Sequence, residues 1–373
     1  MGMIVDADTH VAESASMWEL LDESMHHRRP VVCKVPDDTL YGPRNAFWLI
    51  DGNMFPKPAG KGSFRLITPS ESDLESSRSD ITIRCREITD PRARLRDMDR
   101  LGVDVQVIYP TLFLMYVTDD ADLEIALTRA YNRWMWQVWE KSDGRLRWTC
   151  VPPLRNVEAS LDEIEQAKEH GAVGIFFRGM EGERTLDDPY FFPVYEHASR
   201  LNLPICVHTG AGCPTLTNMF DHARHGVFHS LLVLPVFAFR DLVANHIPER
   251  FPDLRFGFIE AAASWIPYVL HVVQRRRKVE GPRAADWGPS FFRDNRLYIA
   301  CEADEDIPYL AQFVGEDNLI IGSDYGHNDP AEERQLVATI RGRNDLPGAL
   351  ADKLLGENAR RLYALQAPDA ASG

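Results

Sequence analysis

The chain has 373 residues, of which 45% are apolar and 26% charged, an ordinary balance for a globular protein. With 41 basic and 56 acidic residues its net charge is −15, which argues against a nucleic-acid partner. No stretch reaches the ~18 apolar residues of a membrane span. Six scattered cysteines without a C-x-x-C pair, and an N-terminus without a signal-like apolar run, favour a reducing, cytoplasmic location.

The first predicted element is a buried strand that ends in polar residues. Residues 4–11 read IVDADTHV, so two β-branched residues precede Asp6, Asp8 and His10. Alternate side chains of a strand share a face, so these three are expected to project together. Two carboxylates beside an imidazole need a counter-charge, which a divalent cation supplies. A loop or a helix cap is the alternative for such a run.

The region from 13 to 89 follows, and it is rich in proline, glycine and serine. A helical piece near 17–21 and a strand pair over 44–51 are predicted within it. A loop this long inside a compact domain is unusual and often functional. It is therefore interpreted as an insertion, a lid-like subdomain that folds over the end of the first strand. A partly disordered excursion over 57–80 is the alternative.

From residue 90 onward strands and helices alternate. Asp90 and Pro91 mark the start of a helix, and Gly102 marks its end. Further strands are predicted over residues 103–109, 146–151, 173–178, 203–208, 254–260, 297–301 and 318–323. Helices are predicted over residues 92–101, 123–141, 157–170, 191–201, 228–247, 265–277, 307–314 and 330–341, with two short helices after Pro347.

Eight strands, each followed by a helix, predict the α/β class and a closed (β/α)8 TIM barrel. A single barrel domain over residues 1–373, with the insertion inside it, is the simplest organisation. No G-x-G-x-x-G motif follows a strand, which argues against an open dinucleotide-binding sheet.

The active site of such barrels lies at the C-terminal ends of the strands. His208 ends the fifth predicted strand, Glu260 ends the sixth, and Asp324 follows the eighth. Closure of the barrel would bring the first and eighth strands side by side. Asp8, His10, His208 and Asp324 are therefore predicted to bind one cation.

Several segments together resemble the amidohydrolase superfamily. The matching motifs are DADTH at 6–10, DPR at 90–92 with GVD at 102–104, VHTG at 207–210, RFPDL at 250–254 and GSDYGH at 322–327. The resemblance is to the amidohydrolase-2 branch, which includes aminocarboxymuconate-semialdehyde decarboxylase and the γ-resorcylate decarboxylases. It implies that Asp8 and His10 are the strand-one ligands, His208 the strand-five ligand and Asp324 the strand-eight carboxylate. It also implies a homodimer or homotetramer.

Two positions depart from the family pattern. Many relatives have histidine or glutamate where this chain has Asp8, and many have histidine where it has Glu260. Relatives with two metal ions bridge them with a carboxylated lysine on strand four, but residues 171–180 contain no lysine. One divalent ion, zinc or manganese, is therefore expected.

Three residues are candidates for proton transfer. Glu260 is the candidate general acid or base, with metal ligation or pairing with an arginine as the alternatives. Asp324 could serve as both ligand and base. His327 lies three residues later and could reach the substrate, or it could be a surface or supporting imidazole.

Four residues are candidates for substrate binding. Arg178 suits a substrate carboxylate, and a salt bridge with Glu181 or Glu183 is its alternative. Tyr109 ends the second strand, and Trp265 follows the sixth. His222 is spaced with His225 and His229 like one face of a helix, so a lid or substrate-contact role competes with independent metal binding.

Three functions remain open at this point. The first is metal-dependent, non-oxidative decarboxylation of an aromatic or unsaturated carboxylic acid, with Asp324 or Glu260 as proton donor. The second is metal-dependent hydrolysis of an amide, ester or lactone, with Asp324 as base. The third is a barrel that binds a small molecule without catalysis. No nucleic-acid or membrane partner is expected for any of them.

Overall fold

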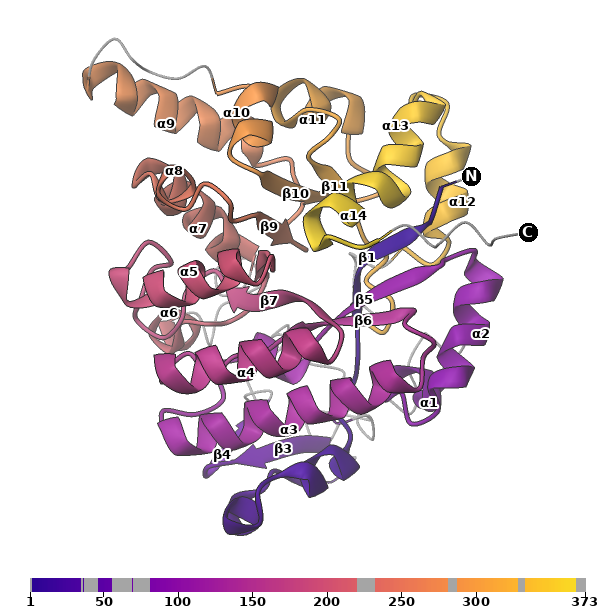
Figure 1. The fold of residues 1–373 in the computed structure, drawn as a ribbon, viewed down its shortest axis with the longest axis vertical. Helices are drawn as coiled ribbons and strands as arrows, with labels where there is room; N and C mark the ends of the chain where they lie inside the picture. Colours follow the sequence, from indigo (N-terminus) through magenta and orange to yellow (C-terminus); the bar gives the residue numbers. More distant parts are fainter. Residues whose placement is uncertain are drawn as a thin grey trace.

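A computed structural model describes residues 2–34, 36, 46–55, 69, 81–219, 232–280, 287–327 and 333–366, with residues 276–280 described as backbone only. The C-terminal helix α14 lies beside β1 and β11 (Figure 1). None of the described helices is both long and apolar enough to cross a bilayer.

Eight parallel strands form one sheet in the order β1-β5-β6-β7-β8-β9-β10-β11. The strands are β1 Val5–His10, β5 Val105–Tyr109, β6 Leu146–Cys150, β7 Ala172–Arg178, β8 Ile205–His208, β9 Phe256–Ile259, β10 Leu297–Cys301 and β11 Leu319–Ile321. The ring closes where Thr9 bridges Tyr325 in parallel, just beyond β11. At this point the N–H of His10 donates to the carbonyl of Tyr325 at 2.7 Å. The predicted (β/α)8 barrel is confirmed.

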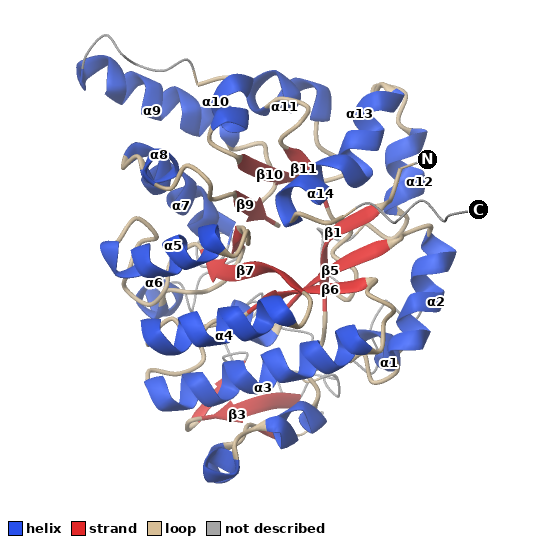
Figure 2. Ribbon diagram, in the orientation of Figure 1, coloured by secondary structure: helices blue, strands red, loops and turns tan. Residues whose placement is uncertain are grey.

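Helices surround the strand ring (Figure 2). Local sequence explains where they begin and end: Asp90 caps α2 and Gly102 ends it in a left-handed conformation, with φ 72°. The α-helices are α1 Ile83–Arg86, α2 Pro91–Leu101, α3 Ala121–Glu140, α4 Val157–Glu169, α5 Phe192–Arg200, α6 Pro214–Met219, α7 Val233–Ala244, α8 Ile247–Arg250, α9 Ile266–Glu280, α10 Pro289–Asp294, α11 Ile307–Val314, α12 Leu336–Gly342, α13 Gly348–Asp352 and α14 Asn358–Tyr363. The 3-10 helices are η1 Ala15–Leu20, η2 Glu23–Arg28, η4 Leu112–Leu114 and η5 Pro189–Phe191, and η7 Lys353–Glu357 is a π-helix.

Two predicted helices differ from the structure. The helix predicted over 228–247 is divided, because α7 ends at Ala244 and α8 begins at Ile247. His246 between them has a left-handed φ of 60°, which a continuous helix does not allow. The helix predicted from residue 330 begins instead at Leu336. The predicted starts, 228 and 330, lie outside the described residues.

The described part of the 13–89 insertion forms its own small antiparallel sheet, β2-β3-β4. Its strands are β2 Val31–Lys34, β3 Ala46–Ile50 and β4 Asn53–Phe55. This sheet lies beside α3 (Figure 1). Arg28 joins the insertion to the barrel, pairing with Asp51 at 2.8 Å and with Asp120, the N-cap of α3, at 2.7 Å. The proposed role of the insertion as a lid stays a prediction. Its alternative, a partly disordered excursion over residues 57–80, concerns residues that lie almost entirely outside the described ones.

Candidate metal centre

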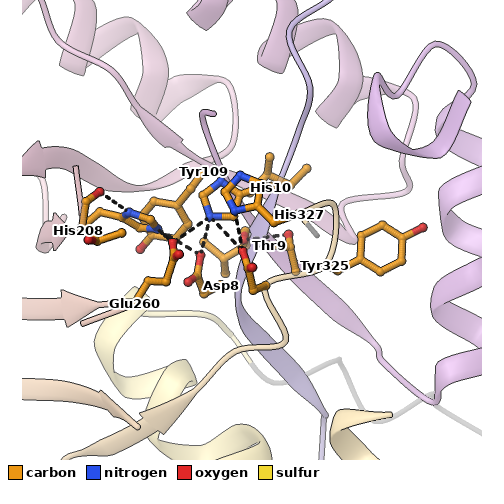
Figure 3. A network of polar contacts seen from close by, with 12 residues as sticks. Asp8, Thr9, His10, Tyr109, His208, Glu260, Tyr325 and His327 are labelled. Atoms are coloured by element: carbon orange, nitrogen blue, oxygen red, sulfur yellow. Dashed lines mark hydrogen bonds and ion pairs between the residues drawn. The ribbon is translucent and has the colours of Figure 1, made fainter. Parts of the chain in front are cut away.

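Four side chains converge at the C-terminal rim of the barrel, from β1 and from the adjacent strands β8 and β9 elsewhere in the ring (Figure 3). Asp8 and His10 come from β1, His208 ends β8, and Glu260 directly follows β9. One nitrogen or oxygen of each lies within 4.8 Å of those of the others. His208 Nε2 is 3.1 Å from Glu260 Oε2 and 3.4 Å from Asp8 Oδ1. His10 Nε2 is 3.3 Å from Glu260 Oε2 and 3.5 Å from Asp8 Oδ1.

Backbone carbonyls decide which nitrogen of each imidazole faces the others. His10 Nδ1 is 3.0 Å from the carbonyl of Pro110, and His208 Nδ1 is 2.8 Å from that of Thr209. A carbonyl oxygen only accepts hydrogen bonds, so each Nδ1 carries the proton and each Nε2 presents a lone pair. Burial, with the nearby His327 and His208, holds the pKa of His10 well below its usual value of 6.5. The neutral imidazole that a metal ion requires is thus the stable form.

The residues present fit a divalent cation. Asp8 Oδ1, His10 Nε2 and His208 Nε2 are buried, and they have no hydrogen-bond partner among the described residues. Each of these atoms brings electron density toward the same point, which is costly without a positive charge between them. Two imidazoles and carboxylates are ligands typical of zinc, manganese and iron.

A second, overlapping group contains His10, Glu260, Asp324 and His327. Asp324 Oδ1 lies 3.5 Å from His10 Nε2 and 2.8 Å from His327 Nδ1. The His327 ring stacks on that of His10, with centroids 3.6 Å apart. His327 Nε2 is 2.9 Å from the hydroxyl of Thr111. Of the predicted ligand set, the structure therefore places Asp8, His10 and His208 with Glu260, and Asp324 with His327 beside them.

Glu260 and Asp324 both have an unusual backbone conformation. Glu260 has a φ of 51° and Asp324 a φ of 52°, in the left-handed region that L-residues rarely adopt. Such conformations persist only where the surroundings impose them, and they concentrate at functional sites. The strained backbone and the convergent side chains thus coincide at the same two residues.

A family model described as Amidohydrolase matches residues 5–365. This chain belongs to the amidohydrolase family. It is an enzyme of the amidohydrolase-2 type, as the resemblance of its motifs implied.

Individual relatives of this amidohydrolase are distant. A 2-amino-3-carboxymuconate-6-semialdehyde decarboxylase from Dictyostelium discoideum is 22% identical over 294 residues, which cover 74% of this chain and 77% of the relative. An amidohydrolase structure from Mycobacterium avium subsp. paratuberculosis superposes with a TM-score of 0.72 at 18% identity, covering 97% of this chain and 99% of the other. A 5-carboxyvanillate decarboxylase from Novosphingobium aromaticivorans, solved with bound manganese, has a TM-score of 0.65 at 18% identity, covering 98% and 97%.

Asp6 does not belong to the candidate metal centre of this amidohydrolase. A β-bulge between Asp6 and Thr9 interrupts the pairing of β1 with β5, so the strict alternation expected along the strand is lost. Asp6 instead accepts the N–H and hydroxyl of Ser323, at 2.8 and 2.6 Å. Burial raises the pKa of Asp6 to about 7. The expectation that Asp6, Asp8 and His10 project together is wrong for Asp6, which holds the loop of Asp324.

Arg178 is engaged within the protein. Its Nε donates to Glu181 Oε2 at 3.0 Å, its Nη2 pairs with the same carboxylate, and its Nη1 donates to the carbonyl of Met115 at 2.7 Å. The arginine is only 7% exposed. The structure thus contains the salt bridge with Glu181 that the sequence left as the alternative.

The other three predicted substrate-binding residues differ in position. Tyr109 is fully buried, with its ring centroid 4.8 Å from that of His208 and its hydroxyl 2.7 Å from that of Tyr363. Trp265 donates its indole N–H to the carbonyl of Ala262 at 2.8 Å. His222 lies outside the described residues, as do His225 and His229. Tyr109 therefore contacts a residue of the site, whereas Trp265 contacts the loop that follows Glu260.

Three residues near the site were missed by sequence reasoning. Glu13 accepts the N–H groups of Thr111 and Leu112, which places the Thr111 hydroxyl against His327. Arg94 is fully buried and donates to the carbonyl of His10 at 2.8 Å. Thr111 lies two residues after the predicted strand 103–109, and that position at the barrel rim could have identified it. Glu13 and Arg94 carry no comparable signal, because their partners are distant in the sequence.

Proposed function

We propose that this enzyme catalyses the metal-dependent, non-oxidative decarboxylation of an aromatic or unsaturated carboxylic acid. The observation that carries the proposal is the group of Asp8, His10, His208 and Glu260, in which two imidazole Nε2 lone pairs and two carboxylates meet. Support comes from the relatives: two of them are named as decarboxylases, and one of these binds manganese.

Asp8, His10, His208 and Glu260 would hold one divalent ion, zinc or manganese. Glu260 takes this role because its Oε2 lies within 3.3 Å of both imidazole nitrogens, closer than Asp324 lies to His10. A bound divalent ion would act as a Lewis acid on a substrate oxygen and stabilise negative charge there. Two carboxylates balance the charge of such an ion, so the loaded site is close to neutral.

Asp324 would transfer the proton. Protonated at Oδ1, it donates to the substrate carbon that bears the carboxylate. The bond from that carbon to the carboxylate then breaks, its electron pair returns to the ring or chain, and carbon dioxide leaves. Asp324 ends as a carboxylate 2.8 Å from His327 Nδ1, which can return a proton to it. His327 would itself be held in place by Thr111.

The test begins with metal analysis of the purified protein, followed by removal of metal and reconstitution with Mn²⁺ or Zn²⁺. The reconstituted enzyme is then assayed on hydroxybenzoates and on unsaturated aminocarboxylic acids, in water enriched in oxygen-18. Carbon dioxide release that depends on the metal, without label in the product, supports the proposal. Label entering the product from an amide, ester or lactone would instead make the enzyme a hydrolase.

Two matched variants separate the roles of the two carboxylates. Glu260→Gln should weaken metal binding, because the variant lacks a charged ligand. Asp324→Asn should keep a metal affinity within about tenfold of the wild-type value. Its turnover should nevertheless fall by the 10²–10⁴-fold that is typical when a general acid is lost. If no preparation holds stoichiometric metal and Asp324→Asn changes no turnover, a non-catalytic binding barrel replaces this proposal.

We also infer a cytoplasmic homodimer or homotetramer, as in relatives of the amidohydrolase-2 branch. Light scattering after size-exclusion chromatography measures the assembly directly, and a monomer at micromolar concentration would contradict the inference.

A further inference from the structure

The loop after β9 holds Glu260 in a conformation that its own sequence disfavours. Glu260 and Ala262 have φ values of 51° and 53°, and neither is a glycine. Two left-handed residues so close together require bonds from outside the loop to keep them there. The position of the Glu260 carboxylate, 3.1 Å from His208 and 3.3 Å from His10, depends on that backbone.

The outside bonds come from Glu305, in the turn between β10 and α11. Glu305 Oε1 accepts the N–H of Ala263 at 3.0 Å, the N–H of Ser264 at 2.7 Å and the hydroxyl of Ser264. Its Oε2 accepts the N–H of Glu302 at 2.9 Å and shares that of Ala263 at 3.1 Å. One carboxylate thus joins the loop of Glu260 to the neighbouring loop of the rim.

Glu305 is itself held in place by a hydrogen bond to its backbone. Arg343, near the end of α12, donates to the carbonyl of Glu305 at 2.8 Å and to that of Ala303 at 2.6 Å. On the other side of the strained loop, the indole of Trp265 donates to the carbonyl of Ala262. The left-handed segment is therefore held at Ala262, Ala263 and Ser264, all within four residues of the metal-facing carboxylate.

We propose that Glu305 is a positioning residue for the Glu260 carboxylate: it clamps the strained loop so that Glu260 faces His10 and His208. The proposal rests on the metal site described under the proposed function. A residue that orients a metal ligand in this way commonly changes metal affinity by about 10- to 100-fold when it is mutated. Glu305 does not touch the ion, so its effect must pass through Glu260.

Glu305→Gln tests the clamp with little change in size. Each Glu305 oxygen accepts at least two donors, so the amide NH₂ of glutamine, wherever it points, meets N–H donors instead of accepting from them. Mn²⁺ and Co²⁺ affinities are measured on the metal-free full-length protein by competition with a chelating dye. We expect Glu305→Gln to weaken both by about 10- to 100-fold. The visible absorption bands of bound Co²⁺ should also shift, because the oxygen of one ligand moves.

Asp306→Ala is the control from the same turn. The Asp306 carboxylate accepts the N–H of Tyr309 and caps α11, so removing it with alanine should lower the unfolding temperature. It should leave the metal affinity within about twofold and the Co²⁺ spectrum unchanged, since an outer carboxylate that does not orient a ligand lacks the larger effect. Equal metal affinity in Glu305→Gln and wild type would overturn the proposal, as would an equal loss in the two variants.

If Glu305→Gln does not fold, Trp265→Phe tests the same loop, because it removes the bond to Ala262 and keeps an aromatic ring for the contact with Phe239. It should shift the Co²⁺ bands in the same direction, and an unchanged spectrum would contradict the clamp. The two proposals fail differently. A wild-type protein that binds no metal removes the proposed function and this inference with it, whereas wild-type binding that Glu305→Gln leaves intact removes this inference alone.

Discussion

The end of β1 with the loops after β8, β9 and β11, and the loops after β5, β6 and β7, lie at the same end of the barrel, yet buried carboxylates meet different partners in each region. On the first side, which we call the imidazole side, Asp8 and Glu260 face the lone pairs of His10 and His208. On the second, the arginine side, Glu181 is paired with Arg178. One fold thus places similar acidic groups in two electrostatic environments.

The difference lies in the groups that each carboxylate faces. The arginine side is satisfied internally, because the Arg178 guanidinium supplies both positive charge and hydrogen-bond donors to Glu181. On the imidazole side, neutral histidines supply neither to the atoms that face the centre. A bound cation would complete that side as Arg178 completes the other.

The strongest test of this comparison removes the arginine. Arg178→Met leaves Glu181 buried without its counter-charge, and breaking such a pair should cost about 3–5 kcal/mol of unfolding free energy. Urea unfolding of the metal-loaded protein measures the loss. Arg184→Met is the control, since its partner Asp188 is partly exposed and an exposed pair contributes about 1 kcal/mol or less. If Arg178→Met loses little unfolding free energy but has a raised KM for a carboxylic acid, the result would instead support substrate binding by Arg178.

The second test adds and removes the cation. Metal at a concentration 100 times its Kd should stabilise the native protein by about 2.7 kcal/mol, and chelation should reverse this. His208→Ala should abolish most of this metal-induced gain in stability, while Arg178→Met should keep it. The exposed His271 on α9 provides a control variant, His271→Ala, which should respond to metal as the wild type does. Equal metal-induced stabilisation in His208→Ala and wild type would contradict the assignment of the imidazole side.

The third test crowds β1 against the end of β11. A Cβ at Gly322 would lie 2.4 Å from Asp8 Cβ and 2.7 Å from the Asp8 nitrogen, so one of the two segments must move. Gly322→Ala should cost about 1–3 kcal/mol and weaken metal binding. A Cβ at Gly348 meets nothing within 4 Å, so Gly348→Ala should leave both quantities unchanged. Normal metal affinity in Gly322→Ala would show that Asp8 tolerates displacement and is not a ligand.

The smallest expected effect concerns Glu124, near Arg178 on the arginine side. Burial raises the pKa of Glu124 from 4.5 to about 7. The native state therefore holds this proton more tightly than the unfolded chain, so the stabilisation is complete below pH 4.5 and is lost as pH rises to about 7. Glu124→Gln should remove this slope and be the more stable form at pH 8, by on the order of 1 kcal/mol. Parallel stability–pH curves for variant and wild type would contradict it.

The predicted site residues show how far position in the sequence can place side chains. Strand ends in a barrel share one rim, so Asp8, His10 and His208 could be brought together from their positions alone. The choice between Glu260 and Asp324 as the fourth partner could not, because it depends on left-handed backbone at both residues and on anchors distant in the sequence. Asp6 anchors one of these loops across 317 residues, and Glu305 anchors the other across 41.

By itself the sequence determined the barrel and most of its strands, since hydrophobic runs and alternation are local properties that the chain carries wherever it folds. It also identified the residue types that bind metal. Only the tertiary structure decided how each acid is used: Glu260 faces the imidazoles, Asp6 holds Ser323, and Glu181 pairs with Arg178. The charge environment of a carboxylate is the sum of neighbours that closure of the ring brings together, and no local pattern encodes that sum.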